Sequence, residues 1–154
     1  ATRLGITCSL FVDHLYYWGD VLVDDLFGRD HGAHWAAAGS ALAAGQRISF
    51  HNDGPVTPTN PIRNIADAVT RRSRSGDVLA PEERIPVGAA LRAQTIDAAW
   101  QLFSDESVGS LTPGAHADIV VLSANPLTVD PDTLADLEVQ ATVFAGKTVY
   151  GTLG

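Results

Sequence analysis

One segment of the chain combines side chains that can bind a metal ion or transfer protons. His51 and Asp53 follow a short apolar stretch that ends at Phe50, and Gly54-Pro55 then breaks the pattern. In parallel α/β folds the functional groups gather at the carboxyl ends of the strands. Alternation along an extended chain also places His51 and Asp53 on the same side. Asp53 is therefore the first candidate for a catalytic or metal-binding residue, with His51 beside it.

A second histidine occupies the equivalent position one strand earlier. His14 follows the apolar residues 5–12, which predict a strand. Parallel neighbours bring equivalent ends together, so we expect His14 and Asp53 to open onto one face, with Trp18 lining a pocket there. Simpler interpretations remain open: Asp53 before Gly-Pro can form an Asx-turn, His51 can be an ordinary strand residue, and Trp18 can pack against the sheet.

The elements around these residues predict an α/β fold. We expect strands at residues 5–12 and 47–50, a loop at residues 15–31, and a helix in the Ala-rich residues 33–44. This order forms a βαβ unit, so the two strands should be parallel.

Further helices are predicted after the second strand. Asn60 is a good N-cap, and Pro61 suits the first position of a helix. From Ile62 onward, apolar residues at i, i+3, i+4 and i+7 form one stripe. The pattern predicts two more helices, at residues 86–95 and 97–103.

The character of the chain changes near residue 104. Residues 117–122 and 139–144 read as strands, and a short Gly-containing turn joins the second of them to residues 148–150. We therefore divide the chain into residues 1–103 and 104–154. A parallel sheet of two strands cannot bury both faces, and the β layer has open edges. Each half is expected to be a piece of a larger architecture.

The composition excludes several classes of function. The net charge of −8 argues against nucleic acid and anionic membranes as partners. The only basic cluster, residues 71–74, is predicted to be a solvated loop after a helix. No apolar run approaches the roughly 18 residues that span a bilayer, and we predict a soluble, cytoplasmic protein. Cys8 is the only cysteine, which excludes a disulfide framework and a Cys-rich zinc site, and it is predicted to be a small buried side chain.

The order of five segments resembles a known family. The chain is similar to the C-terminal part of metal-dependent amidohydrolases of the family 3 type, a group that includes N-substituted formamide deformylases. Each motif alone is weak, but five in the same order form a specific pattern. The matching segments are residues 14–20 (HLYYWGD), 51–56 (HNDGPV), 89–95, 109–122 and 142–150.

The resemblance implies a fold and a set of roles. The family fold is a (β/α)8 barrel of the TIM type with a small β-sandwich, in which residues 8–13 would be strand seven and residues 47–53 strand eight. Asp53 would bind a divalent metal, zinc in the complete enzyme, and carry a proton from the attacking water to the leaving nitrogen. His14, Trp18 and His51 would line the substrate pocket. Asn52 stands where the family usually has serine, and the family's other metal ligands lie on strands one to six, which this chain does not contain.

Two main functions follow as hypotheses; a third, a small-molecule binding module, rests on Tyr16, Tyr17 and Trp18 alone. In the first, the chain is the C-terminal fragment of a hydrolase that cleaves C–N bonds in small amides or N-formyl compounds, and it needs the remainder of the barrel or another copy of itself. In the second, it is a non-catalytic folded or oligomerising module derived from such an enzyme. In both cases the isolated chain is expected to be inactive and to bind zinc weakly.

Overall fold

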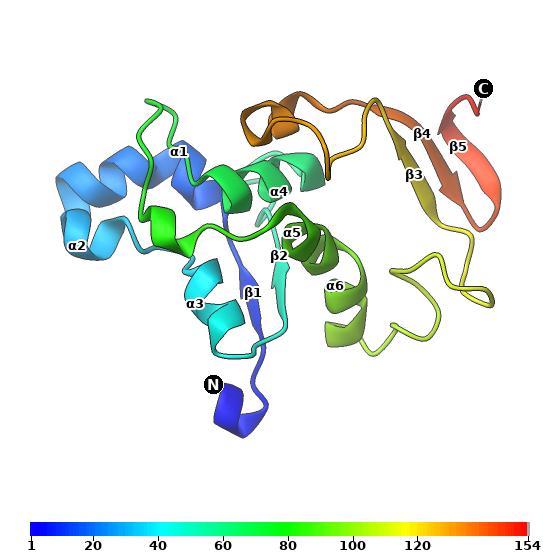
Figure 1. The fold of residues 1–154 in the computed structure, drawn as a ribbon, viewed down its shortest axis with the longest axis horizontal. Helices are drawn as coiled ribbons and strands as arrows, with labels where there is room; N and C mark the ends of the chain where they lie inside the picture. The colour runs from blue at the N-terminus through cyan, green and yellow to red at the C-terminus, as the bar shows by residue number, and fades with distance from the viewer. Residues whose placement is uncertain (154) are drawn as a thin grey trace.

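Two separate sheets organise the chain, which is of the α/β class as expected (Figure 1). The structure is a computed structural model and describes residues 1–153. The first sheet is a parallel pair formed by β1 (Cys8–Leu10) and β2 (Ile48–Phe50). The second is antiparallel, with the order β3 (Ile119–Leu122), β4 (Val139–Phe144) and β5 (Lys147–Gly151).

Helices fill the connection between β1 and β2, where the sequence pattern predicts a loop at residues 15–31. That prediction is wrong. The helices are α1 (Asp13–Val21), the π-helical segment η2 (Leu22–Phe27) and α2 (Arg29–Gly32). Leu15 and Val23 are buried in a cluster with Leu79, which comes from a distant part of the chain. The helical spacing of the apolar residues in this segment matches that tertiary contact. The run of aromatic residues after Leu15 makes this spacing hard to recognise in the sequence.

A buried arginine explains why the predicted helix at residues 33–44 is shortened to α3 (Ala38–Ala43). The prediction that residues 71–74 form a solvated loop is wrong for Arg71, which has no exposed surface. Its guanidinium donates hydrogen bonds to four backbone oxygens, those of Leu79 (2.6 Å), Ala33 (2.9 Å), Ala36 (3.0 Å) and Trp35 (3.0 Å). Burial lowers the pKa of Arg71 to about 10, so the side chain stays charged at neutral pH. Residues 33–36 therefore curve around a cation instead of continuing the helix.

The helices after β2 lie where the sequence predicts them. α4 (Pro61–Thr70) begins with Pro61, and the side-chain oxygen of Asn60 accepts a hydrogen bond from the backbone nitrogen of Arg63 at 3.1 Å. α5 (Val87–Gln94) and α6 (Ile96–Gln101) follow. The capping signal at Asn60 and Pro61 is thus sufficient to place the start of α4, because capping depends on neighbours within one turn.

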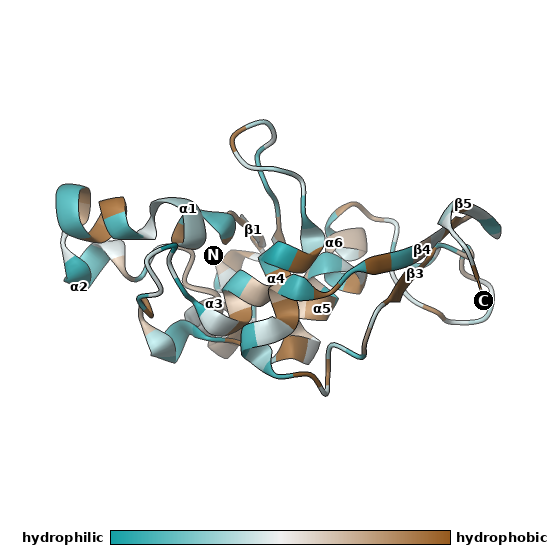
Figure 2. Cartoon of the chain, turned by 90° about the horizontal axis from the view of Figure 1, so that it is seen from above, coloured by the Kyte–Doolittle hydropathy of each residue, from teal (hydrophilic) through white to brown (hydrophobic). Residues whose placement is uncertain are grey.

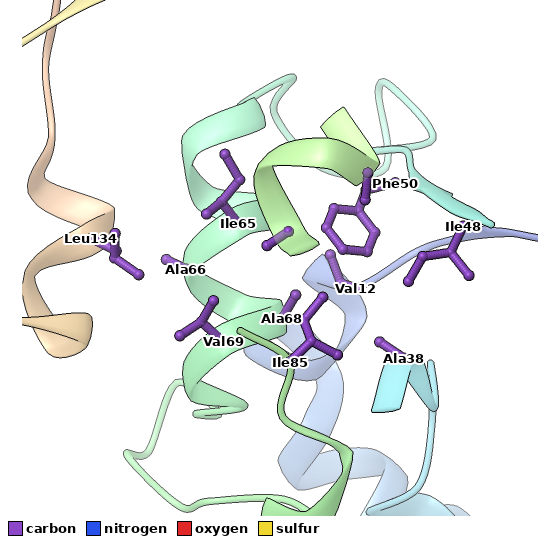
Figure 3. Close-up of a cluster of buried hydrophobic side chains, with 12 residues drawn as sticks. Val12, Ala38, Ile48, Phe50, Ile65, Ala66, Ala68, Val69, Ile85 and Leu134 are labelled. Carbon is purple, nitrogen blue, oxygen red and sulfur yellow. The ribbon is translucent and has the colours of Figure 1, made fainter. Parts of the chain in front are cut away.

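The main hydrophobic core lies between the parallel pair and α4 (Figure 3). Val12 follows β1 and packs in the same cluster as Ile48 and Phe50 of β2. On the other side of the cluster are Ile65 and Ala68 of α4. Because all three positions of β2 are buried, this core holds the carboxyl ends of both strands, where the candidate functional residues begin.

The antiparallel sheet is joined to the core through η4 (Pro131–Asp136), which precedes β4. Leu134 of η4 is 1% exposed and lies beside Ala66 of α4 in Figure 3. The three strands and the turn at Ala145-Gly146, where both residues have positive φ, agree with the predicted hairpin and its neighbouring strand.

Large apolar side chains remain exposed on several elements. Phe103 is 96% exposed and Leu102 is 74% exposed, just after α6, and every residue of β5 is exposed. Figure 2 shows apolar segments on β3 and β4. Within the described residues, β1 and β2 have only each other as partners, so each has an open outer edge. Such edges and patches are what an oligomer or a larger fold would cover.

Two smaller expectations complete the description. Cys8 is half-buried rather than buried, and its sulfur lies 3.5 Å from the side-chain oxygen of Gln46. Among residues 1–153, no helix combines the length and the apolarity needed to cross a bilayer.

Candidate active site at the carboxyl ends of β1 and β2

The parallel pair brings the candidate residues to one end of the sheet. Leu10 pairs with Phe50, and the backbone nitrogen of His51 donates to the oxygen of Leu10 at 3.2 Å. His14 lies in the first turn of α1, directly beyond β1. Asp53 lies in the turn beyond β2, with φ +48°. His14, His51 and Asp53 therefore share the end of the sheet at which the sequence places them.

An aromatic cluster joins the two histidines. The ring of Phe11 lies 3.9 Å from that of His14 and 5.2 Å from that of His51, measured between ring centroids. Trp18 meets His14 edge-on at 5.1 Å, because positions 14 and 18 are one turn apart on α1. Trp18 thus packs beside His14, as both the pocket and the packing interpretations require.

Trp35 belongs to the same cluster and is a residue that the sequence analysis misses. Its indole nitrogen donates to Nδ1 of His14 at 3.3 Å, and its ring stacks on Phe27 at 6.0 Å. An indole N–H can only donate, so Nδ1 of His14 is an acceptor, and the proton of the neutral ring is on Nε2. Nothing in the spacing of the sequence connects Trp35 to His14, because the fold of residues 33–36 around Arg71 brings the two together.

The electrostatics of the cluster keep His14 neutral. Burial lowers the pKa of His14 below its usual value, and the nearby His51 lowers it further, whereas Asp53 and Asp13 act in the opposite direction. His51 is exposed, and its Nδ1 lies 3.0 Å from the hydroxyl oxygen of Ser9. A neutral His14 offers an Nε2–H donor rather than a positive charge.

The carboxylate of Asp53 is exposed, while its neighbour Asn52 is buried. The turn after β2 closes through the main chain, since the backbone nitrogen of Val56 donates to the backbone oxygen of Asp53 at 2.8 Å. The hydroxyl of Thr57 donates to the backbone oxygen of Asn52 at 2.7 Å and closes the same turn. The side chain of Asp53 is therefore not needed to hold the turn and is available for another partner.

Beneath the site lies a layer of buried polar side chains. The amide nitrogen of Asn52 donates to Asp13 at 2.7 Å and to the amide oxygen of Asn64 at 3.2 Å, and Asn64 donates back to Asn52 at 3.1 Å. Asp13 and Asn52 directly precede His14 and Asp53 in the chain. The layer therefore connects the two segments that carry the candidate residues, and neither the layer nor its members were singled out by spacing in the sequence.

The residues present fit one metal ligand and not a complete metal site. Within residues 1–153, no three side chains of His, Cys, Asp or Glu gather closely enough to hold an ion. A catalytic zinc needs three protein ligands and an open position. Asp53 offers one exposed carboxylate at the carboxyl end of the sheet, which is one of the three ligands that such a site needs.

Comparison with known proteins defines the class. A sequence model of the amidohydrolase family, family 3, matches residues 1–150, and the chain belongs to this family. This agrees with the resemblance carried by the five ordered segments.

Particular relatives are similar over most of the chain. YtcJ of Bacillus subtilis (strain 168), named as an amidohydrolase, is 31% identical over 156 residues, which cover 97% of this chain and 29% of YtcJ. The N-substituted formamide deformylase of Arthrobacter pascens is 31% identical over 115 residues, which cover 75% of this chain and 21% of the deformylase.

The fold is also found in solved structures. An uncharacterised metal-dependent hydrolase from Pyrococcus horikoshii OT3 superposes with a TM-score of 0.67 at 19% identity, over 84% of this chain and 26% of that one. The chain thus spans less than a third of the length of each of these proteins.

Proposed function

We propose that this chain is the C-terminal part of a metal-dependent hydrolase of C–N bonds. In this proposal β1 and β2 are strands seven and eight of a (β/α)8 barrel, residues 1–103 complete that barrel, and residues 104–154 contribute to a small β-sandwich. The support is the family membership, the share of the relatives that the chain covers, and the open edges of β1 and β2. The remainder of the barrel would pair with those edges.

The observation that carries the proposal is the meeting of Asp53, His14 and His51 at the carboxyl ends of the two strands. Asp53 would supply one ligand to a divalent metal, zinc by family resemblance. The bound ion would supply a water of lowered pKa. The Asp53 carboxylate would accept the proton of this water and donate it to the leaving nitrogen, which departs as a neutral amine.

The aromatic cluster would bind the substrate. The Nε2–H of neutral His14 is a donor suited to the carbonyl oxygen of an amide or a formyl group. The faces of Trp18 and Phe11 suit an apolar substituent on the nitrogen. N-formyl amines are the first class to test, because one relative is named as an N-substituted formamide deformylase.

The test uses the complete protein that contains this chain, loaded with zinc. We expect hydrolysis of an N-formyl amine or a small amide, and we expect Asp53→Asn to lower kcat by about a thousandfold or more, because both proton transfer and one metal ligand are affected. Asp24→Asn neutralises another exposed aspartate, which lies in η2 in the connection between β1 and β2; it is the matched control and should leave kcat unchanged. An Asp53→Asn protein with full activity would refute the role of Asp53.

A non-catalytic, oligomerising module is the second candidate, favoured by the exposed Phe103 and Leu102. In that case residues 1–154 alone should form a stable oligomer by light scattering, and the complete protein should hydrolyse none of the amides. Tight one-to-one zinc binding with turnover by the isolated chain would contradict both candidates.

A further inference from the structure

Two buried carboxyl oxygens beneath the candidate site have no hydrogen-bond partner among the described residues. They are Oδ1 of Asp13 and Oδ2 of Asp67, and each residue is 1% exposed. Buried polar atoms are almost always paired, since an unpaired one loses its hydration without compensation. The two carboxyl groups lie within hydrogen-bonding reach of each other. One proton held between them would satisfy both orphaned atoms.

The balance of charge around Asp13 and Asp67 also favours one shared proton. Arg63 Nε lies 3.0 Å from the other oxygen of Asp67, and the Arg63 guanidinium lies over the ring of Tyr16 at 3.4 Å. Two ionised carboxylates would leave this group with an excess negative charge in a buried place. With one proton, the pair carries a single negative charge that Arg63 neutralises, and close carboxyl pairs elsewhere behave in this way.

Asp67 is the member that holds the proton. The pKa of Asp67 is raised to about 8, mainly because the carboxyl group is buried; Arg63 opposes this shift, and the charge of Asp13 contributes to it. Burial also raises the pKa of Asp13, but hydrogen bonds from Asn52 and Asp67 oppose it. The groups facing the pair are thus Arg63 of α4, which lies over Tyr16 of α1, and the side chains of Asn52 and Thr57 after β2.

We propose that Asp67 is a positioning residue, which shares a proton with Asp13 and so clamps α1, the turn after β2 and α4 into one unit that orients His14 and Asp53. Asn64 and Asp67 are three residues apart and therefore lie on one face of α4. Asn64 bonds Asn52 in both directions, and Asp67 lies within hydrogen-bonding reach of Asp13. Each residue that is clamped is the immediate neighbour of a candidate site residue.

Asn52 links the two halves of the clamp. Its amide donates both to Asp13 and to Asn64 and accepts from Asn64. A serine hydroxyl has one proton and is shorter, so it could not make all three contacts. Asn52, which stands where the family resemblance predicts serine, is thus part of the same clamp.

The role of the clamp in catalysis rests on the proposed function. The shared proton itself can be measured without an activity assay. In the complete protein we expect an infrared C=O band of a protonated aspartic acid, assigned by isotopic labelling of aspartate. At pH values above about 5, where ordinary carboxyl groups are ionised, the band should be present in wild type up to the pKa of about 8 and lost above it, and it should be absent in Asp67→Asn. If wild type lacks the band below that pKa, the shared proton is refuted.

Two variants of similar size test the positioning role. The amide of Asp67→Asn can still donate to Asp13, whereas Asp67→Leu cannot. We expect Asp67→Asn to keep kcat within about threefold and Asp67→Leu to lower kcat about 10- to 100-fold with a smaller change in KM, since misplacement of reacting groups affects mainly the chemical step. The ring nitrogen NMR signals of His14 should move in Asp67→Leu and stay in Asp67→Asn.

The outcomes separate the clamp from the proposed function. Unmoved His14 signals in a folded Asp67→Leu protein would overturn the positioning role, even if the infrared band is present. Should Asp67→Leu fail to fold, Asp67→Ala, which also cannot donate to Asp13, takes its place, with the same His14 signals as the readout and the same meaning. A complete protein without hydrolase activity would refute the proposed function, while the infrared band and the His14 signals would still decide the clamp.

Discussion

Two polar clusters lie next to each other at the carboxyl ends of β1 and β2, and the chain alternates between them. His14 and Asp53 face outward, whereas Asp13 and Asn52, one residue earlier in each case, face inward. The outer side chains are exposed or half-buried and have free donor or acceptor atoms. The inner ones are buried and bonded to one another. The difference teaches that a polar residue at a strand end has a functional or a structural role according to which side of the backbone it takes.

The outer cluster gives the largest expected effect. Asp53→Asn should lower kcat of the complete protein by about a thousandfold while changing the free energy of unfolding by less than about 0.5 kcal/mol, because the carboxylate is exposed and asparagine tolerates positive φ. Steady-state kinetics and urea unfolding on the same samples measure both. A loss of stability above about 1 kcal/mol would mean that Asp53 supports the fold, and the difference in role between the outer and inner clusters would disappear.

A substitution in the inner cluster should lower the stability directly and the activity only as a consequence. Asn64→Leu keeps the branched shape and the number of heavy atoms of the side chain but removes both bonds with Asn52, so we expect a loss of about 2–3 kcal/mol in unfolding free energy. Activity should fall only as far as His14 and Asp53 are displaced. Urea unfolding checks the stability, and Arg74→Leu, at an exposed site outside the cluster, is a suitable control. Unchanged stability would show that the buried bonds contribute nothing net.

The pH dependence of stability should report the inner cluster alone. The folded-state pKa of Asp67 is raised from 3.8 to about 8, so the folded protein binds more protons than the unfolded one between these values. Stability is therefore lost as the pH rises through about 8. Above the ordinary histidine pKa of 6.5, where the lowered pKa of His14 no longer acts, the slope should approach about 1.4 kcal/mol per pH unit.

The control for this pH effect is Asp67→Asn, which has no proton to lose. The difference between wild type and Asp67→Asn in urea unfolding, taken at several pH values, isolates the contribution of Asp67. A wild-type curve parallel to that of Asp67→Asn from neutral pH to pH values above 8 would show that Asp67 does not change its ionisation there.

The smallest effect is expected at the edge of the outer cluster. Trp35→Phe keeps an aromatic ring against Phe27 but removes the donor to Nδ1 of His14. We expect the His14 ring to become a mixture of its two neutral forms in nitrogen NMR spectra, with KM raised by no more than about threefold. Stability should change by less than about 0.5 kcal/mol, since Trp35 is 41% exposed. A single unchanged His14 form would show that another group holds the ring.

Local signals in the sequence were enough for some elements and insufficient for others. The N-cap Asn60 with Pro61 and the hairpin turn at Ala145-Gly146 were predictable, because their causes lie within a few residues. The helices of residues 13–32 were not, because the apolar side of that segment is completed by Leu79. Arg71 was assigned to the solvent by its charge, and only the backbone oxygens that surround it explain its burial.

The sequence by itself determined the family, the parallel pair of strands and the meeting of His14, His51 and Asp53 at its carboxyl end, since period, order and strand direction are properties of the chain. The tertiary structure alone decided which neighbours those residues have. Trp35 at His14 and the buried Asp13–Asp67 pair beneath them join segments more than 20 residues apart. Such contacts depend on how the helices pack, and no local pattern encodes that.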